Sequence, residues 1–194
     1  MNKLVIKTIL ITLACAVGAL AVVFGALCIF APVTVAGFFD DVGNYSASVF
    51  FYEKQYDKTG DIDDLDVLVL KAYGNSDTVR AEEYLKEMIE HEDFEEFCSG
   101  ANGANMSDKE YYYGYYALSL AKNGKIDKAI SVSKDFVLEH GYTKFNPLRT
   151  LVSEFLSGAT TSEKGKIKAA DESVKTTEAV QEDYKNQDLQ TLNK

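Results

Sequence analysis

Residues 111–130 read YYYGYYALSLAKNGKIDKAI, and this stretch places five tyrosines within six consecutive positions. An α-helix turns by about 100° per residue, so five such rings cannot all lie on one side of it. Tyr113 and Tyr116 share the face that also carries Ala117 and Leu120. We expect this face to be buried, with the small alanine allowing a second helix to approach closely.

The neighbouring face of this predicted helix carries Tyr111, Tyr115 and Lys122, while Tyr112 is expected nearer the outside. Tyrosine is favoured at protein interfaces, so Tyr111 and Tyr115 are either packing residues or part of a binding groove. Gly114, in mid-helix, costs about 1 kcal/mol relative to alanine. Such a glycine often admits a close neighbour, which is either another helix or a bound peptide.

The segment GKIDKAI at 124–130 resembles the turn and second-helix start of the tetratricopeptide repeat. The positions that match the family's packing pattern are Tyr113, Tyr116, Ala117, Leu120, Gly124, Ala129 and Phe136. Residues 53–72 resemble the same unit, but Glu53 and Leu65 stand where small residues are expected. An alternative framing pairs the helices at 62–73 and 77–90. Either framing implies stacked antiparallel helix pairs over 40–157.

The resemblance also implies a concave groove that binds a protein or peptide partner. Its lining would comprise Phe50, Phe51, Tyr111, Tyr115 and Lys122.

The N-terminal part has no charged residue between Lys7 and Asp40, a gap of 32 positions. About 20 apolar residues suffice to cross the hydrocarbon of a bilayer, and the run is too long for the apolar core of a secretory signal. We therefore predict a retained transmembrane helix at roughly 4–30, and we assign residues 8–36 to the anchor that contacts the lipid bilayer. Pro32 is expected to break the helix or to mark its exit from the membrane.

Flanking charges predict the orientation of this anchor. Lys3 and Lys7 precede it, whereas Asp40 and Asp41 follow it. The positive-inside rule then places residues 1–7 in the cytoplasm and the rest of the chain outside, as in a single-pass protein of the cell membrane. Residues 40–156 hold 12 basic and 23 acidic groups, a net charge of −11, which argues against a nucleic-acid surface.

A stripe of small residues runs along the predicted anchor at Ala14, Gly18, Ala21, Gly25 and Cys28. Small residues at this spacing let membrane helices approach closely, so the anchor is a candidate surface for homo-oligomers. Gly and Ala are also common in any membrane helix.

The sequence offers little support for catalysis or for a cofactor. It lacks the common nucleophile, zinc-protease and phosphate-loop motifs, so we expect a protein that is not an enzyme. Glu87, His91, Glu95 and Cys98 share a side of a continuous helix, but a solvated acidic helix end explains them better than a metal site. Cys98 is expected to be a buried small hydrophobe.

The C-terminal residues 158–194 contain one aromatic residue, Tyr184, and few other apolar side chains. We expect a polar tail that is disordered or weakly helical. The sequence thus predicts an all-α chain with one transmembrane helix, a helical-repeat domain and this tail. The expected function is protein–protein interaction, as a scaffold or accessory of envelope or secretion machinery. An ion- or ligand-sensing domain and a structural homo-oligomer subunit are the alternatives.

Overall fold

The structure is a computed structural model that describes the backbone of residues 3–99, 106–140 and 146–192, and side chains over 5–99, 109–140 and 146–176. Within these ranges the backbone forms helices and no strand, as the sequence predicts. The chain divides into two compact units, Met1–Lys71 and Ala72–Lys194. The division falls inside one helix, so the predicted domain at 40–157 comprises parts of both units.

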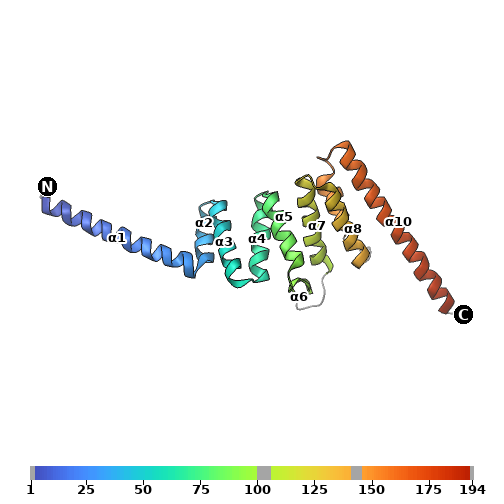
Figure 1. Ribbon diagram of the computed structural model, residues 1–194, viewed down its shortest axis with the longest axis horizontal. Helices are drawn as coiled ribbons and strands as arrows, with labels where there is room; N and C mark the ends of the chain where they lie inside the picture. Colours follow the sequence, from blue (N-terminus) through green and yellow to red (C-terminus); the bar gives the residue numbers. More distant parts are fainter. Residues whose placement is uncertain (1–2, 100–105, 141–145, 193–194) are drawn as a thin grey trace. The chain divides into compact units, whose positions relative to one another are not determined.

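The first unit begins with a long apolar helix, α1 (Lys3–Phe30), shown in blue in Figure 1. Its residues from Val5 to Phe30 form a helix long and apolar enough to cross a membrane, and none of the most apolar stretch is buried. The predicted break at Pro32 is confirmed, because Pro32 is the first residue of the next helix, α2 (Pro32–Asp41). Residues 32–36 of the predicted anchor range therefore belong to α2.

The helices α2 and α3 (Tyr45–Thr59) form an antiparallel pair beside the end of α1 (Figure 1). Asn44 caps α3 by accepting a hydrogen bond from the Ala47 amide at 3.2 Å. Val35, Ala36 and Phe51 form the core of this pair, with Cys28, Phe39 and Tyr52 packed around it. The core thus joins the last turn of α1 to both helices.

A polar hub on α2 extends the packing of this unit to α4 (Ile62–Gly74). The Asp40 carboxylate accepts hydrogen bonds from Ser48 Oγ at 2.6 Å, Tyr52 hydroxyl at 3.2 Å and Lys71 Nζ at 2.5 Å. Burial opposes the charge on Asp40, but the bonds from Lys71 and Ser48 hold its pKa below the usual value. The hub therefore holds an ionised carboxylate among three elements.

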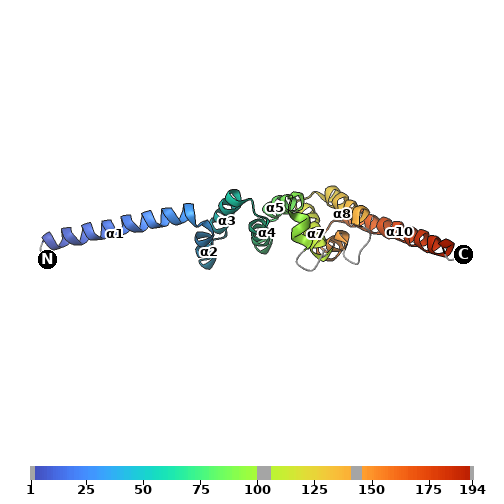
Figure 2. The same cartoon turned by 90° about the horizontal axis from the view of Figure 1, so that it is seen from below.

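The second unit is built around α7 (Met106–Lys122), which lies between α5 (Thr78–Glu90) and α8 (Ile126–His140) in Figures 1 and 2. The short α6 (Phe94–Ser99) and α9 (Pro147–Thr150) also pack on α7. The largest side chains that are fully buried in this core are Leu85, Met88, Leu118, Leu120, Phe136, Leu148, Leu151 and Ile167.

The turn between α7 and α8 is held by glycine and by a hydrogen-bonded asparagine. Gly124 has φ of +79°, a left-handed conformation that favours glycine. Asn123 donates from Nδ2 to the Thr78 carbonyl and to Glu82, both at 2.9 Å. Lys125 adds an ion pair to Glu82 at 2.7 Å. These contacts fasten the turn to the start of α5.

Four of the tyrosines in the 111–116 run have side chains in the interior or at its edge. Tyr116 is buried, as predicted, and Tyr113 is half-buried with its ring 4.9 Å from that of Phe136. The prediction for Tyr112 is wrong, because its ring is 6% exposed and lies 5.8 Å from that of Phe94. The reason is α6, the short helix that precedes α7 in the chain, because its Phe94 and Phe97 rings cover this side of α7.

The C-terminal part continues from α9 through a π-helix, η1 (Leu151–Phe155), to α10 (Thr161–Leu192). The tail, expected to be disordered or weakly helical, thus forms a helix in the structure. Ile167, Ala170 and Val174 are buried, and α10 contacts α8 and α9. Their spacing of three and four residues makes an apolar stripe, which a count of apolar residues overlooks.

Candidate interaction surface

Three tyrosine rings and a lysine meet on one side of α7, and we refer to Tyr73, Tyr111, Tyr115 and Lys122 as the tyrosine surface. The Tyr73 ring meets that of Tyr115 edge to face at 4.3 Å between centroids, and Tyr111 lies 4.5 Å from Tyr115. The Lys122 Nζ lies 5.5 Å from the Tyr73 ring centroid, within the range of a cation–π contact.

The helical period explains how α7 contributes to this surface. Tyr111 and Tyr115 are four residues apart, and Lys122 follows seven residues later, so all three share one face. Sequence reasoning identified these three residues but missed Tyr73. It lies in the last turn of α4, four residues after the buried Val69, and nothing in its local sequence indicates that it contacts Tyr115.

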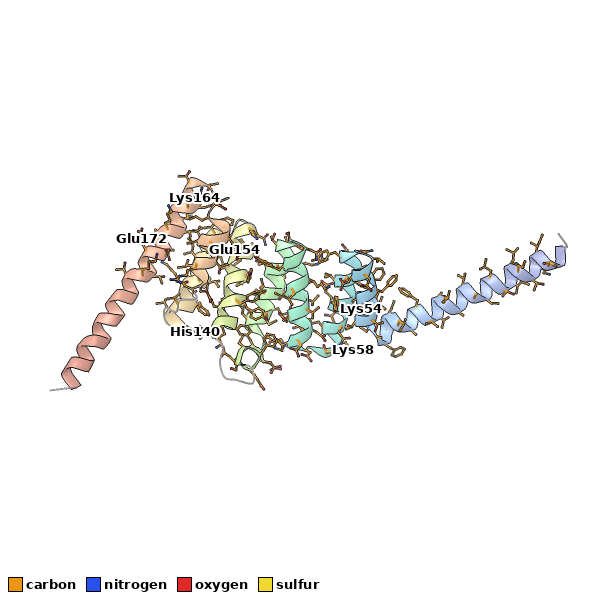
Figure 3. All side chains as sticks on the ribbon, turned by 180° about the vertical axis from the view of Figure 1, so that it is seen from behind. Lys54, Lys58, His140, Glu154, Lys164 and Glu172 are labelled. Carbon is orange, nitrogen blue, oxygen red and sulfur yellow. The ribbon has the colours of Figure 1, made fainter. Side chains whose placement is uncertain are left out.

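Hydrogen bonding and burial keep the phenols of this surface neutral. The Tyr73 hydroxyl donates to Glu154 Oε2 at 3.3 Å, and Glu154 is labelled in Figure 3. Burial raises the pKa of Tyr73, and the charge of Glu154 raises it further. The pKa of Tyr115 is raised for the same two reasons. The hydroxyls therefore serve as hydrogen-bond groups, and neither is poised to act as a base.

Exposure differs among the members of the tyrosine surface. Tyr111 is 38% exposed and Lys122 is exposed, whereas Tyr73 and Tyr115 are half-buried. The two half-buried rings hold Tyr111 in place through its contact with Tyr115. The result is one accessible aromatic ring packed against two half-buried rings, with a cation on the same helix face. Such a surface can pack against an apolar side chain and donate hydrogen bonds from Lys122.

The structure divides the predicted groove residues between the two units. Phe50 and Phe51 belong to Met1–Lys71, whereas Tyr111, Tyr115 and Lys122 belong to Ala72–Lys194. Phe51 is only 9% exposed because it belongs to the core of α2 and α3, so it offers little surface to a partner. Phe50 is exposed, and its ring meets that of Phe51 at 5.2 Å.

The close neighbour expected beside Gly114 is another helix. A Cβ atom at Gly114 would lie 2.8 Å from Oγ1 of Thr150 and 3.4 Å from its Cβ. Thr150 ends α9, so the missing side chain lets α9 approach α7. Gly114 thus has a packing role in this fold.

The small-residue stripe on α1 is exposed. Ala14, Gly18, Ala21 and Gly25 all lie at the surface, and a Cβ atom at either glycine would have no neighbour within 4 Å. Cys28, the last member of the stripe, packs against the core of α2 and α3. The stripe is therefore exposed along most of α1, and its last member contacts the α2–α3 pair.

The residues considered for metal binding have other surroundings. Cys98 is buried, as predicted, and Glu95 is exposed and forms an ion pair with Lys109. In the part of the chain that the structure describes, no group of three or more His, Cys, Asp or Glu could hold a metal ion.

Comparison with known proteins gave no match to a protein-family model, a curated protein or a solved structure. The class of the protein thus follows from its own features. Over the residues that the structure describes, it is a helical protein without strands, with one N-terminal helix that is long and apolar enough to span a membrane.

Proposed function

We propose that this chain is a single-pass membrane protein whose helical part binds a protein or peptide partner through the tyrosine surface. In this proposal α1 is the anchor, the N-terminus is cytoplasmic, and the remaining helices lie on the outer side. The role would be that of a scaffold or accessory of envelope or secretion machinery, with stacked helix pairs similar to tetratricopeptide repeats.

The observation that carries the binding proposal is the arrangement of Tyr111. Its ring is accessible, yet it is already held by Tyr115, which is held by Tyr73. A side chain that is fixed before binding loses little conformational entropy on binding, which favours affinity. An apolar side chain of the partner would pack on Tyr111, and a carbonyl or carboxylate group would accept a hydrogen bond from Lys122.

Photocrosslinking from two positions tests this proposal. A photoreactive phenylalanine at position 111 should capture a partner in native membranes, and the same residue at position 138 should not. Leu138 is a suitable control because it is 72% exposed on α8. The captured protein is then purified and titrated directly. Tyr111→Ala should weaken its binding by about 30-fold, as expected for an aromatic hot spot worth about 2 kcal/mol.

The control variant Leu138→Ala should leave that affinity unchanged. Equal affinity for the Tyr111→Ala variant and the wild type, with both folded, would refute the role of the tyrosine surface.

The proposed orientation rests on Lys3 and Lys7 before α1 and on Asp40 and Asp41 after it. A Leu138→Cys variant tests it through labelling with a maleimide that does not cross membranes. Labelling in intact cells is expected. Labelling only after the cells are opened would place α8 in the cytoplasm and overturn the proposed orientation.

A second candidate function is lateral assembly through α1, which the exposed stripe favours. Replacement of Gly18 and Gly25 by leucine would block close approach of a second α1. A homo-oligomer of the wild type that becomes monomeric in this variant would support the assembly role. A wild type that is monomeric in membranes would exclude it.

A further inference from the structure

Exposed apolar side chains are concentrated in residues 33–50, which comprise most of α2, the turn after it and the start of α3. Outside α1, the described residues include eight large hydrophobic side chains that are exposed, and four of them lie within residues 33–50. These four are Val33, Phe38, Val42 and Phe50. The other four are spread over residues 70–138. The concentration near α1 therefore needs a physical explanation.

A continuous row of rings fixes the two exposed phenylalanines to the core. Phe38 meets Phe39 at 5.5 Å, Phe39 stacks on Phe51 at 5.7 Å, and Phe51 meets Phe50 at 5.2 Å. The inner rings, Phe39 and Phe51, pack on the core of α2 and α3. The outer rings, Phe38 and Phe50, are thus exposed at the two ends of the row.

The same core places this row at the end of the apolar helix. Cys28, in the last turn of α1, packs against the core that holds Phe39 and Phe51. The apolar helix Val5–Phe30 has 26 residues and is therefore about 39 Å long. The hydrocarbon core of a bilayer is about 30 Å thick, and a bilayer with its headgroup regions is about 40–45 Å thick. The helix is therefore longer than the hydrocarbon core and nearly as long as the whole bilayer is thick. The end of α1, and the row beside it, would then lie at the level of the headgroups.

We infer that Phe38, Val42 and Phe50 form an interfacial seat, which inserts into the headgroup region of the bilayer that α1 crosses. This inference rests on the proposed membrane anchoring, but not on the proposed orientation or partner. Apolar side chains at this depth gain by leaving water, and helices with an apolar face commonly lie in this region. The seat would hold the base of the α2–α3 pair against the membrane surface.

Two lysines flank the seat on α3. Lys54 and Lys58 follow Phe50 at intervals of four residues and are labelled in Figure 3. The Lys54 Nζ lies 5.7 Å from the Phe50 ring centroid. Asp41 on α2 and Asp57 on α3 carry exposed carboxylates. The net charge around the seat therefore does not favour binding to anionic lipid. Insertion of the rings, and not attraction by charge, is therefore the expected source of binding.

The absence of tryptophan from the chain allows a direct test. Single variants Phe38→Trp and Phe50→Trp of the full chain are reconstituted into phosphatidylcholine vesicles that contain lipids brominated at shallow or deep acyl positions. Tryptophan is excited selectively. Two further reporters are Leu13→Trp in α1 and Leu138→Trp in α8, because both leucines are exposed in the structure. Circular dichroism confirms that each variant is helical.

The expected pattern separates the seat from the anchor. Leu13→Trp should be quenched most by deep bromines, whereas Phe38→Trp and Phe50→Trp should emit at shorter wavelength and be quenched most by shallow bromines. Leu138→Trp should remain open to the aqueous quencher acrylamide. If Leu13→Trp is quenched but both phenylalanine positions behave like position 138, the seat is refuted and the anchor stands. If Leu13→Trp is not quenched by lipid, anchoring fails and the seat fails with it.

Two other results would overturn the seat in specific ways. Emission from positions 38 and 50 that is shifted but not quenched by lipid would show that protein covers these residues. Quenching that appears only after anionic lipid is added would assign the contact to Lys54 and Lys58.

Discussion

Gly114 is the position where a single methyl group tests the packing of α7 against α9. In an exposed helix, Gly→Ala stabilises by about 1 kcal/mol because alanine has the higher helix propensity. At Gly114, however, the new Cβ would lie 2.8 Å from Oγ1 of Thr150. Overpacking of this kind typically costs about 1–3 kcal/mol. We therefore expect Gly114→Ala to destabilise the second unit by a net amount of about 1 kcal/mol.

A second substitution separates the two opposing contributions. Thr150→Ala removes Oγ1, and the nearest remaining atom, the Thr150 Cβ, lies 3.4 Å from the added methyl group. In that background only the gain in helix propensity remains. Gly114→Ala should then stabilise by up to about 1 kcal/mol, so that its effect changes sign. The coupling between the two positions would be about 2 kcal/mol.

Urea unfolding of the full chain in detergent measures these differences. Near-ultraviolet circular dichroism of the tyrosines is a suitable signal, because α1 contains no tyrosine and does not contribute to it. The four proteins of the cycle are compared by their midpoints at equal slope. Stabilisation by Gly114→Ala in the wild-type background would refute the predicted clash. An equal cost in the Thr150→Ala background would show that the strain has another source.

Three further predictions concern the titrating groups and the tail. Burial raises the pKa of Glu110 to about 7, against the opposing charge of Arg149, so stability should fall as the pH rises from about 5 to about 8. Urea midpoints at those two pH values should show this fall, and Glu110→Gln should abolish it. The lowered pKa of Asp40 means that its stabilisation is present at neutral pH and is lost below about pH 4. Asp40→Asn should therefore destabilise the first unit by about 1–3 kcal/mol at pH 7, and an unchanged urea midpoint of that unit would contradict the role of the Lys71 contact. Ile167→Ala, at a site with no exposure, should cost about 2–4 kcal/mol and speed amide hydrogen exchange in α10, whereas unchanged exchange would show that the helix does not depend on this contact.

Local patterns in the sequence were sufficient to predict the helices and several of their details. The long uncharged run predicted α1, Pro32 predicted where it ends, and the period of the tyrosine run predicted the burial of Tyr116. The helical period of the tyrosine run also placed Tyr111, Tyr115 and Lys122 on one face. These features depend on spacing within a single helix, which the helical period determines directly.

The tertiary structure decided what covers each of those faces. Tyr112 is buried because α6 packs over it, and Phe51 is buried because α2 folds back on α3. Tyr73 joined the tyrosine surface through a contact with a residue 42 positions away. Helical spacing shows which side chains share a face, but a face becomes core or surface only through elements that arrive from elsewhere in the chain. Contacts of that kind depend on how helices pack, and no local pattern in this sequence encodes them.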